Sequence, residues 1–340
     1  MGSMDRKGFI STSMLATVAG FWGSSRHNKL QKSAITAIKP QRIPKNATIG
    51  LIAPASPVYN ADDFTEMVDT LQGFGFKLVL GQHVRNQRGY LAGTDIDRAN
   101  DINAMFANKN IDAILCVRGG WGCNRILELI DYEVVKNNPK ALIGFSDITS
   151  LHMAIQAKTG LTTFHGPVGT SNWNEFTLES WNSVLFNAAA AHYQIPEDQD
   201  DAFTIRGGSA TGKLLGGNLT VLTAMMGSNY LPSFEGAILF LEDVGEDAYR
   251  IDRMLTQLSL NGVLRQCAGV VLGKFTDCDD TGNSLSLKEV LDDHLLKLNI
   301  PAFYGAMISH QKKNCTLPVG ISATINADNR TIQLLEPGVA

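Results

Sequence analysis

Ser146 stands where an apolar run gives way to a helical pattern, and this position suits a nucleophile. Residues Ala141 to Phe145 predict a buried strand, and residues Asp147 to Gln156 predict a helix with one apolar face. A serine on so sharp a turn projects its hydroxyl away from the sheet, beside the first free amides of the helix. We therefore predict that Ser146 takes part in acyl transfer. The alternative is a buried serine that only caps the helix.

Glu242 and His310 offer the other two groups that such a serine needs. A serine hydroxyl is a poor nucleophile until a base takes its proton, and an imidazole base needs a carboxylate or carbonyl to fix its tautomer. Glu242 ends a predicted strand, and His310 follows it along the chain. The order serine, acid, histidine is that of α/β hydrolases, although unrelated folds use every order. The alternatives are a solvated carboxylate at Glu242 and an exposed loop histidine at His310.

The glycine-rich segment Gly119-Gly120-Trp121-Gly122 can point backbone amides into a site. It matches neither the G-x-G-x-x-G dinucleotide pattern nor a phosphate loop, because no Gly-Lys-Ser/Thr follows. The amide of Asp147 and one from Gly119 or Gly120 could form an oxyanion hole, in which each donor lowers the barrier by about 3 to 4 kcal/mol. The alternative is a tight turn that needs positive φ.

Composition argues against several other functions. The seven histidines form no H-E-x-x-H or H-x-H pair, and no carboxylate cluster completes a site, so we predict neither a metal nor another cofactor. A net charge of −4, a pI near 6.0 and the absence of a basic run argue against a nucleic-acid partner. The five cysteines fit neither a zinc site nor a disulfide framework, so we expect buried thiols.

From Asn46 the chain alternates predicted strands and helices, which indicates an α/β fold with a doubly wound, mostly parallel sheet. Such sheets bind ligands at the carboxyl ends of their strands. Three unusual loops fall there: Pro54-Ala55-Ser56, residues 118–122 and residues 145–147. We expect these loops to converge on one site.

The same pattern predicts a domain organisation. Residues 46–170 form the nucleophile-bearing parallel domain, residues 171–206 a linker, and residues 207–340 a smaller mixed α/β domain that carries the acid and the histidine. In the second domain we expect strands over 237–241 and 269–273, helices over 219–226, 249–258 and 287–298, and a hairpin that turns near Asp328-Asn329.

Residues 1–45 predict a leader or a disordered tail. The segment from Asp5 to His27 resembles a twin-arginine export leader, with Lys7 in place of the second arginine. Its apolar part is too short and too rich in Ser and Thr to span a bilayer, and no other membrane span is visible. If the segment is a leader, we expect an exported or periplasmic protein. If it is a disordered tail, we expect a cytoplasmic protein.

Several motifs together resemble the LD-carboxypeptidase family of serine peptidases, from about Asn46 to the end of the chain. The motifs are Val117-Arg118-Gly119-Gly120-Trp121-Gly122, Gly144-Phe145-Ser146-Asp147-Ile148-Thr149, His165-Gly166-Pro167, Gly216-Gly217-Asn218, Leu241-Glu242-Asp243, Tyr249-Arg250-Ile251-Asp252-Arg253 and His310. Trp121 stands where the family often has tyrosine. The resemblance implies that catalysis occurs between a parallel-sheet domain with the nucleophile and a mixed domain with the other two triad members.

The resemblance also implies residue roles. Ser146 would be the nucleophile, His310 the general base and acid, and Glu242 the orienting carboxylate, with amides of Asp147 and Gly120 as oxyanion donors and Gly119 as the alternative to Gly120. The predicted substrate-binding residues are Arg118, Trp121, Asn218 and Arg250. Arg118, Arg250 or Arg253 could hold a terminal carboxylate through a bidentate pair.

The family's usual substrate is a peptidoglycan-derived peptide, the murein tetrapeptide, from which it removes D-Ala after meso-diaminopimelate during cell-wall recycling. The resemblance allows a homodimer. Two alternatives stay open: a microcin-immunity peptidase that cleaves aminoacyl nucleotide conjugates, and a wall-fragment binding protein that has lost catalysis.

Overall fold

The computed structural model describes residues 37–340, apart from 198 and 279–281. Of the predicted leader or disordered tail over residues 1–45, residues 1–36 lie outside the described residues. The prediction is wrong for residues 37–45, because Ile43 is buried and the Ile38 amide donates to the Gly160 carbonyl at 2.9 Å. Within the described part, none of the helices combines the length and the apolar character that crossing a membrane requires.

The first sheet has the strand order β12-β5-β4-β3-β1-β2, and all its strands are parallel except β12, which pairs antiparallel with β5. This arrangement confirms the predicted mostly parallel sheet. Its strands are β1 (Thr48–Ile52), β2 (Lys77–Leu80), β3 (Ala113–Cys116), β4 (Ala141–Gly144), β5 (Thr163–His165) and β12 (Leu317–Val319).

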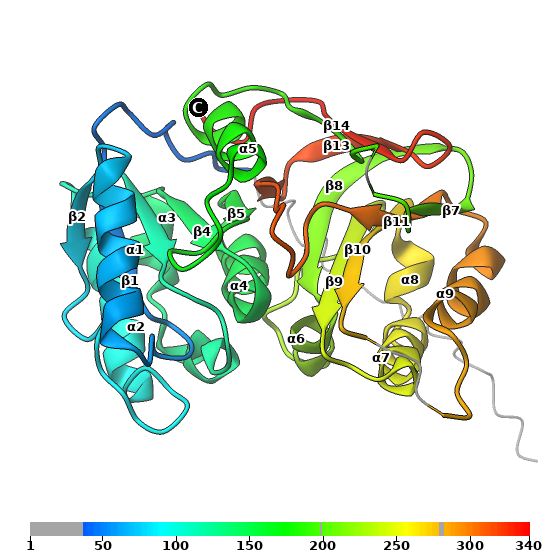
Figure 1. The fold of residues 1–340 in the computed structure, drawn as a ribbon, viewed down its shortest axis with the longest axis horizontal. Coiled ribbons are helices and arrows are strands. Elements are labelled where there is room, and N and C mark those ends of the chain that lie inside the picture. Colours follow the sequence, from blue (N-terminus) through cyan, green and yellow to red (C-terminus); the bar gives the residue numbers. More distant parts are fainter. Residues whose placement is uncertain (1–36, 198, 279–281) are drawn as a thin grey trace, which may run out of the picture. The chain divides into compact units, whose positions relative to one another are not determined.

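Helices cover both faces of this sheet, and α1 crosses in front of it in Figure 1. Successive strand residues point to opposite faces. Leu51 and Leu115 pack with α1 and α5, whereas their neighbours Ile52 and Ile114 belong to the cluster that contains α2, α3 and α4. The helices are α1 (Ala61–Gly73), α2 (Asp95–Ala107), α3 (Tyr132–Asn137), α4 (Thr149–Thr159) and α5 (Glu175–Leu185), with 3₁₀ segments η1 (Cys123–Leu129) and η2 (Ser146–Ile148).

The second sheet is mixed, with the order β6-β14-β13-β8-β9-β10-β11-β7 and four central parallel strands, β8 to β11. Its strands are β6 (His192–Gln194), β7 (Phe203–Arg206), β8 (Ser209–Asn218), β9 (Ile238–Val244), β10 (Gly269–Thr276), β11 (Ala302–Ala306), β13 (Ser322–Asn326) and β14 (Thr331–Leu334). Its helices are α6 (Leu219–Ala224), α7 (Ala248–Leu260), α8 (Val263–Gln266), α9 (Leu287–Leu295) and the 3₁₀ segment η3 (Leu296–Leu298). The predicted hairpin is confirmed as β13–β14.

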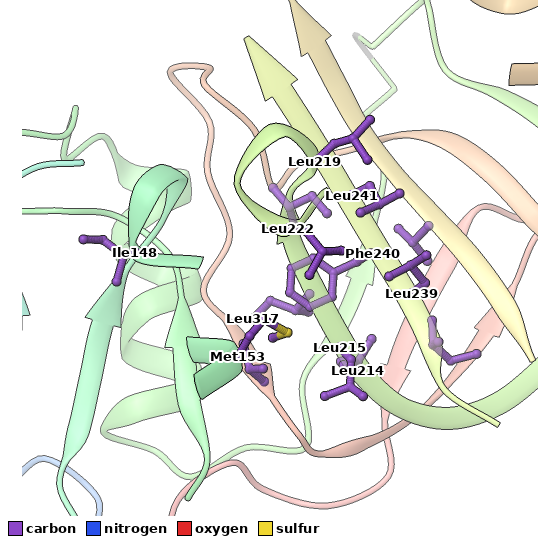
Figure 2. Packing of buried hydrophobic residues seen from close by; sticks show 14 of the residues in the cluster. Ile148, Met153, Leu214, Leu215, Leu219, Leu222, Leu239, Phe240, Leu241 and Leu317 are labelled. Atoms are coloured by element: carbon purple, nitrogen blue, oxygen red, sulfur yellow. The ribbon is translucent and has the colours of Figure 1, made fainter. Parts of the chain in front are cut away.

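The two sheets meet through α4 and β12. The Thr149 hydroxyl at the start of α4 accepts the Asn218 amide of β8 at 2.9 Å. A Cβ at Gly217 would lie 2.3 Å from that hydroxyl, so only glycine permits the approach. Figure 2 shows Met153 of α4, Leu317 of β12 and Phe240 of β9 in the shared apolar cluster.

Some elements differ from the sequence-based expectation. Residues 171–206 contain α5 and two strands of the second sheet, β6 and β7. The motif Gly216-Gly217-Asn218 ends the long strand β8. Its glycines are required by close backbone approach, since a Cβ at Gly216 would collide with the Phe240 carbonyl of β9.

Candidate active site

Ser146 occupies the turn between β4 and α4 with a φ of 65°, in the left-handed region. A non-glycine residue held there costs about 1 to 3 kcal/mol and is often found at functional sites. Ser146 makes no capping hydrogen bond at η2, and the N-cap of α4 is Ile148. The helix-capping alternative is therefore wrong, and the predicted sharp strand-to-helix turn is confirmed.

Ser146 and His310 line the same cavity, which has a volume of about 690 Å³. Its walls come from the loop after β1, helix α1, the glycine segment, the segment after β5 and the loop after β11. The lining of the cavity also includes Asp63, Glu66, Arg118, Gly119, Gly120, Phe145 and Lys312.

Glu242 orients His310. The imidazole Nδ1 lies 2.7 Å from Glu242 Oε2, and Glu242 on β9 is fully buried. Because a carboxylate only accepts, Nδ1 is the donor, and the neutral ring carries its lone pair on Nε2. The ring also packs against Phe145, the neighbour of Ser146, with a centroid separation of 4.8 Å. The alternative of a solvated Glu242 is wrong.

The electrostatic surroundings favour the charged form of His310. Burial opposes the imidazolium, but the hydrogen bond to Glu242 and the charges of Glu242 and Asp243 outweigh it, so the pKa of His310 lies above its ordinary value. Asp243 is itself buried, and burial together with the Glu242 charge raises its pKa to about 6. The site therefore stabilises the proton that a serine nucleophile must give up.

The three loops predicted to converge do contact one another. The Ser56 amide donates to the Gly119 carbonyl at 3.3 Å, and the Cys123 amide donates to Asp147 Oδ2 at 2.8 Å. A Cβ at Gly119 would lie 3.1 Å from Ser146 Oγ. Among the described residues, the amides of Gly119 and Gly120 donate to no backbone carbonyl.

The predicted substrate-binding residues divide into two groups. Arg118 lines the cavity, where its guanidinium donates to the Pro57 carbonyl at 3.2 Å. The other three, Trp121, Asn218 and Arg250, are not among the lining residues.

Those three residues make contacts outside the lining of the cavity. Asn218 is buried and its side chain donates to Asp243 while capping α6, so its role is structural. Arg250 is exposed beside Glu246 and Asp247, and Arg253 stacks on Tyr249. Trp121 is half exposed and packs edge-on against Tyr90.

Sequence reasoning missed the carboxylates of α1 and Lys312 as cavity residues. Asp63 and Glu66 lie one turn apart on the helix that follows the first predicted site loop. Their place in the sequence could have predicted that they line the cavity, because a helix after such a loop borders the carboxyl edge of the sheet. Lys312 stands two residues after His310.

In the described part of the chain, no group of three or more His, Cys, Asp or Glu side chains is placed to share a metal ion. The five cysteines are free and buried, as the sequence predicts.

Two family descriptions match the chain. The LD-carboxypeptidase N-terminal domain matches residues 49–166, and the LD-carboxypeptidase C-terminal domain matches residues 211–325. The chain belongs to the LD-carboxypeptidase family. It is thus a hydrolase of the serine peptidase type. Ser146 lies within the first matched region, and Glu242 and His310 lie within the second.

Individual relatives align with most of this chain and with nearly all of their own length. The probable murein peptide carboxypeptidase of Bacillus subtilis is 37% identical over 309 residues, 89% of this chain and 95% of the relative. The microcin C7 self-immunity protein MccF of Escherichia coli is 33% identical over 85% of this chain and 93% of its own.

Solved structures agree with these matches. A structure of microcin C7 self-immunity protein MccF superposes with a TM-score of 0.83 and 30% identity, covering 89% of this chain and all of the other. The muramoyltetrapeptide carboxypeptidase of Oxalobacter formigenes superposes with a TM-score of 0.74 and 29% identity, over 84% of this chain and 97% of its own.

Proposed function

We propose that this LD-carboxypeptidase uses Ser146, His310 and Glu242 to release D-Ala from murein tetrapeptide. The observation that carries the proposal is the shared cavity, in which a serine held at positive φ faces the same space as a histidine oriented by a buried carboxylate. These are the groups that acyl transfer requires.

In the proposed reaction, Ser146 Oγ attacks the carbonyl carbon of the scissile amide while His310 Nε2 takes the hydroxyl proton. The oxyanion accepts hydrogen bonds from the Asp147 amide and from Gly119 or Gly120. His310 then gives its proton to the leaving nitrogen, the C–N bond breaks, and an ester on Ser146 remains. Water, deprotonated by His310, hydrolyses this ester and regenerates the serine.

The charges around the cavity support a peptide that carries both amine and carboxylate groups. Arg118 and Lys312 are placed to pair with the terminal carboxylate, and Asp63 and Glu66 of α1 face the same space. Diaminopimelate has a free amine and a free carboxylate on its side chain. Both the carboxylates and the cationic side chains of the cavity would therefore have a partner of opposite charge. The Bacillus subtilis relative, named as a murein peptide carboxypeptidase, supports this substrate.

A second candidate is hydrolysis of an aminoacyl nucleotide conjugate. A relative named for microcin self-immunity gives the higher of the two structural similarities above, and one of its structures is described as a complex with glutamyl sulfamoyl guanosine. The carboxylates at Asp63 and Glu66 disfavour it, because a phosphate-linked conjugate would bring negative charge toward them.

One experiment separates these functions. The protein is incubated with murein tetrapeptide or with an aminoacyl nucleotide conjugate, with and without a chelator, and released D-Ala or amino acid is quantified. We expect D-Ala release that survives chelation and that Ser146→Ala abolishes while the variant stays folded and still binds the peptide. Turnover of the conjugate alone would favour the second candidate. Binding without turnover of either would indicate a wall-fragment binding protein.

A further inference from the structure

Arg98 is the most deeply buried cation in the described part of the chain, and no step of the proposed reaction uses it. It lies on α2 with 1% of its surface exposed. Its guanidinium donates to the Pro54 carbonyl and, from the same nitrogen Nη1, to the Gly122 carbonyl at 2.9 Å. These acceptors belong to two of the loops that form the cavity. A buried guanidinium is costly unless it is well paired. The Asp95 carboxylate pairs with the other nitrogen, Nη2, so Nη1 is available for the two loop carbonyls.

The peptide group between Gly122 and Cys123 is held from both sides. Its carbonyl accepts from Arg98, and its N–H donates to the carboxylate of Asp147 at 2.8 Å. Asp147 follows Ser146 directly and is 2% exposed. One peptide bond of the glycine segment is therefore fixed between a buried cation and the residue next to the nucleophile.

The glycine segment is shaped to admit this cation. Gly122 has a φ of 130°, and a Cβ there would lie 2.8 Å from Arg98 Nη1. Ser56 holds the other end, because its hydroxyl accepts the Trp121 amide at 3.2 Å and its amide donates to Gly119. The Gly120 N–H belongs to the peptide group whose carbonyl accepts from Ser56, and the Gly119 N–H lies one peptide group before it.

We propose that Arg98 and Asp147 form a clamp on the Gly122–Cys123 peptide that fixes the oxyanion-binding amides in register with Ser146. Arg98 is a positioning residue: it touches no substrate and acts through the backbone of the glycine segment. The inference rests on the proposed role of Ser146 as nucleophile. It does not depend on which peptide or conjugate is cleaved.

A fluorophosphonate probe tests the clamp independently of the substrate. The activated serine attacks phosphorus and displaces fluoride, and the negative charge that develops on the phosphoryl oxygen during this step needs the oxyanion donors. We measure the maximal inactivation rate and the probe's half-saturating concentration separately. Removal of one oxyanion donor lowers rates by about 10²- to 10³-fold. We expect Arg98→Met to lower the maximal rate about 10²-fold, with the half-saturating concentration changed less than about threefold.

Three further variants keep the test decisive. Arg98→Lys retains the charge but not the planar fork, and we expect a loss of about tenfold. Asp147→Asn keeps the shape and removes the charge, and should also lower the maximal rate. Arg125→Met is the matched control, because Arg125 pairs with Asp95 as Arg98 does but lies at the surface; it should label like the wild type.

Melting curves for every variant identify those that do not fold, and the inference is drawn from the folded ones. Folded Arg98→Lys and Asp147→Asn proteins that label at the wild-type rate would overturn the clamp and leave the proposed function intact. A wild-type protein that labels no faster than Ser146→Ala would remove the nucleophile, and the clamp with it.

Discussion

At the scale of single residues, the site depends on a backbone strain and a buried charge. Ser146 is held at positive φ, and Glu242 is fully buried with His310 as its hydrogen-bonded partner. Breaking such a buried pair by removing one partner costs about 3 to 5 kcal/mol, because the remaining charge is left uncompensated. Both features are unfavourable for folding alone, so their presence together indicates that function maintains them.

The raised pKa of His310 predicts the pH dependence of the reaction. As the base, His310 must be neutral, so kcat/KM should rise with pH through a limb centred above 6.5, the ordinary histidine value. The same shift stabilises the folded protein below the unfolded pKa, and this contribution is lost as pH rises through the folded pKa. The value of kcat/KM should therefore rise over the same pH range in which the stabilisation from His310 is lost.

The Glu242→Gln variant checks the cause of this shift. Without the carboxylate, the effect of burial dominates, and the limb should move to lower pH. The amide can also select the wrong tautomer, so kcat should fall about 10³- to 10⁴-fold. Glu336→Gln, which changes an exposed carboxylate paired with Lys39, is the control and should leave the profile unchanged. A limb at the same pH in Glu242→Gln would contradict the assignment.

At the scale of elements, the glycine segment and the turn at Ser146 are close enough that a methyl group matters. A Cβ at Gly119 would lie 2.9 Å from Ser146 Cβ and 3.3 Å from the Phe145 carbonyl. We expect Gly119→Ala to shift the segment and lower kcat about 10²-fold, since displaced donors lose their stabilisation of the oxyanion. Steady-state kinetics and a melting curve measure the two effects separately.

Gly73→Ala is the matched control for that substitution. Gly73 ends α1, and nothing lies within 4 Å of a Cβ placed there. Alanine should leave kcat unchanged and stabilise the helix by up to about 1 kcal/mol. Equal activity of the two glycine variants would contradict a crowded site at Gly119.

Local patterns predicted the elements that carry their own signal. The strand Ala141–Gly144 falls within the predicted strand over Ala141 to Phe145. The turn at Ser146 was predictable because an apolar strand meets a helix with one apolar face. Strand β12 was not predicted, because three residues hold too little periodicity and its partner β5 lies far away in sequence.

The sequence motifs predicted the positions of the reactive groups more accurately than the roles of the residues around them. A motif residue such as Asn218 can support the site from behind, through Asp243, instead of lining it. Arg98 carried no signal, because a single arginine in a helical pattern is usually solvated. Its role is set by tertiary contacts with two loops, which no local pattern encodes.

At the scale of the whole molecule, the site requires the two sheets to stay joined. Ser146 follows β4 of the first sheet, whereas Glu242 lies on β9 and His310 follows β11, both strands of the second sheet. After His310 the chain returns to the first sheet as β12, where Leu317 pairs with His165. The His165 ring also bonds to the Ile308 carbonyl at 2.8 Å, just before His310.

Leu317 should therefore couple stability to activity. It is fully buried in the cluster that α4, β8 and β9 share, so Leu317→Ala should lower the free energy of unfolding by about 2 to 5 kcal/mol. Because β12 anchors the segment after His310, kcat should also fall in the protein that remains folded. Leu260→Ala changes a leucine that is 80% exposed and should cost less than about 0.5 kcal/mol. Denaturant unfolding measures the free energy of unfolding, and kinetics below the unfolding transition measure kcat. A Leu317→Ala protein as stable as Leu260→Ala would show that β12 does not hold the two sheets together.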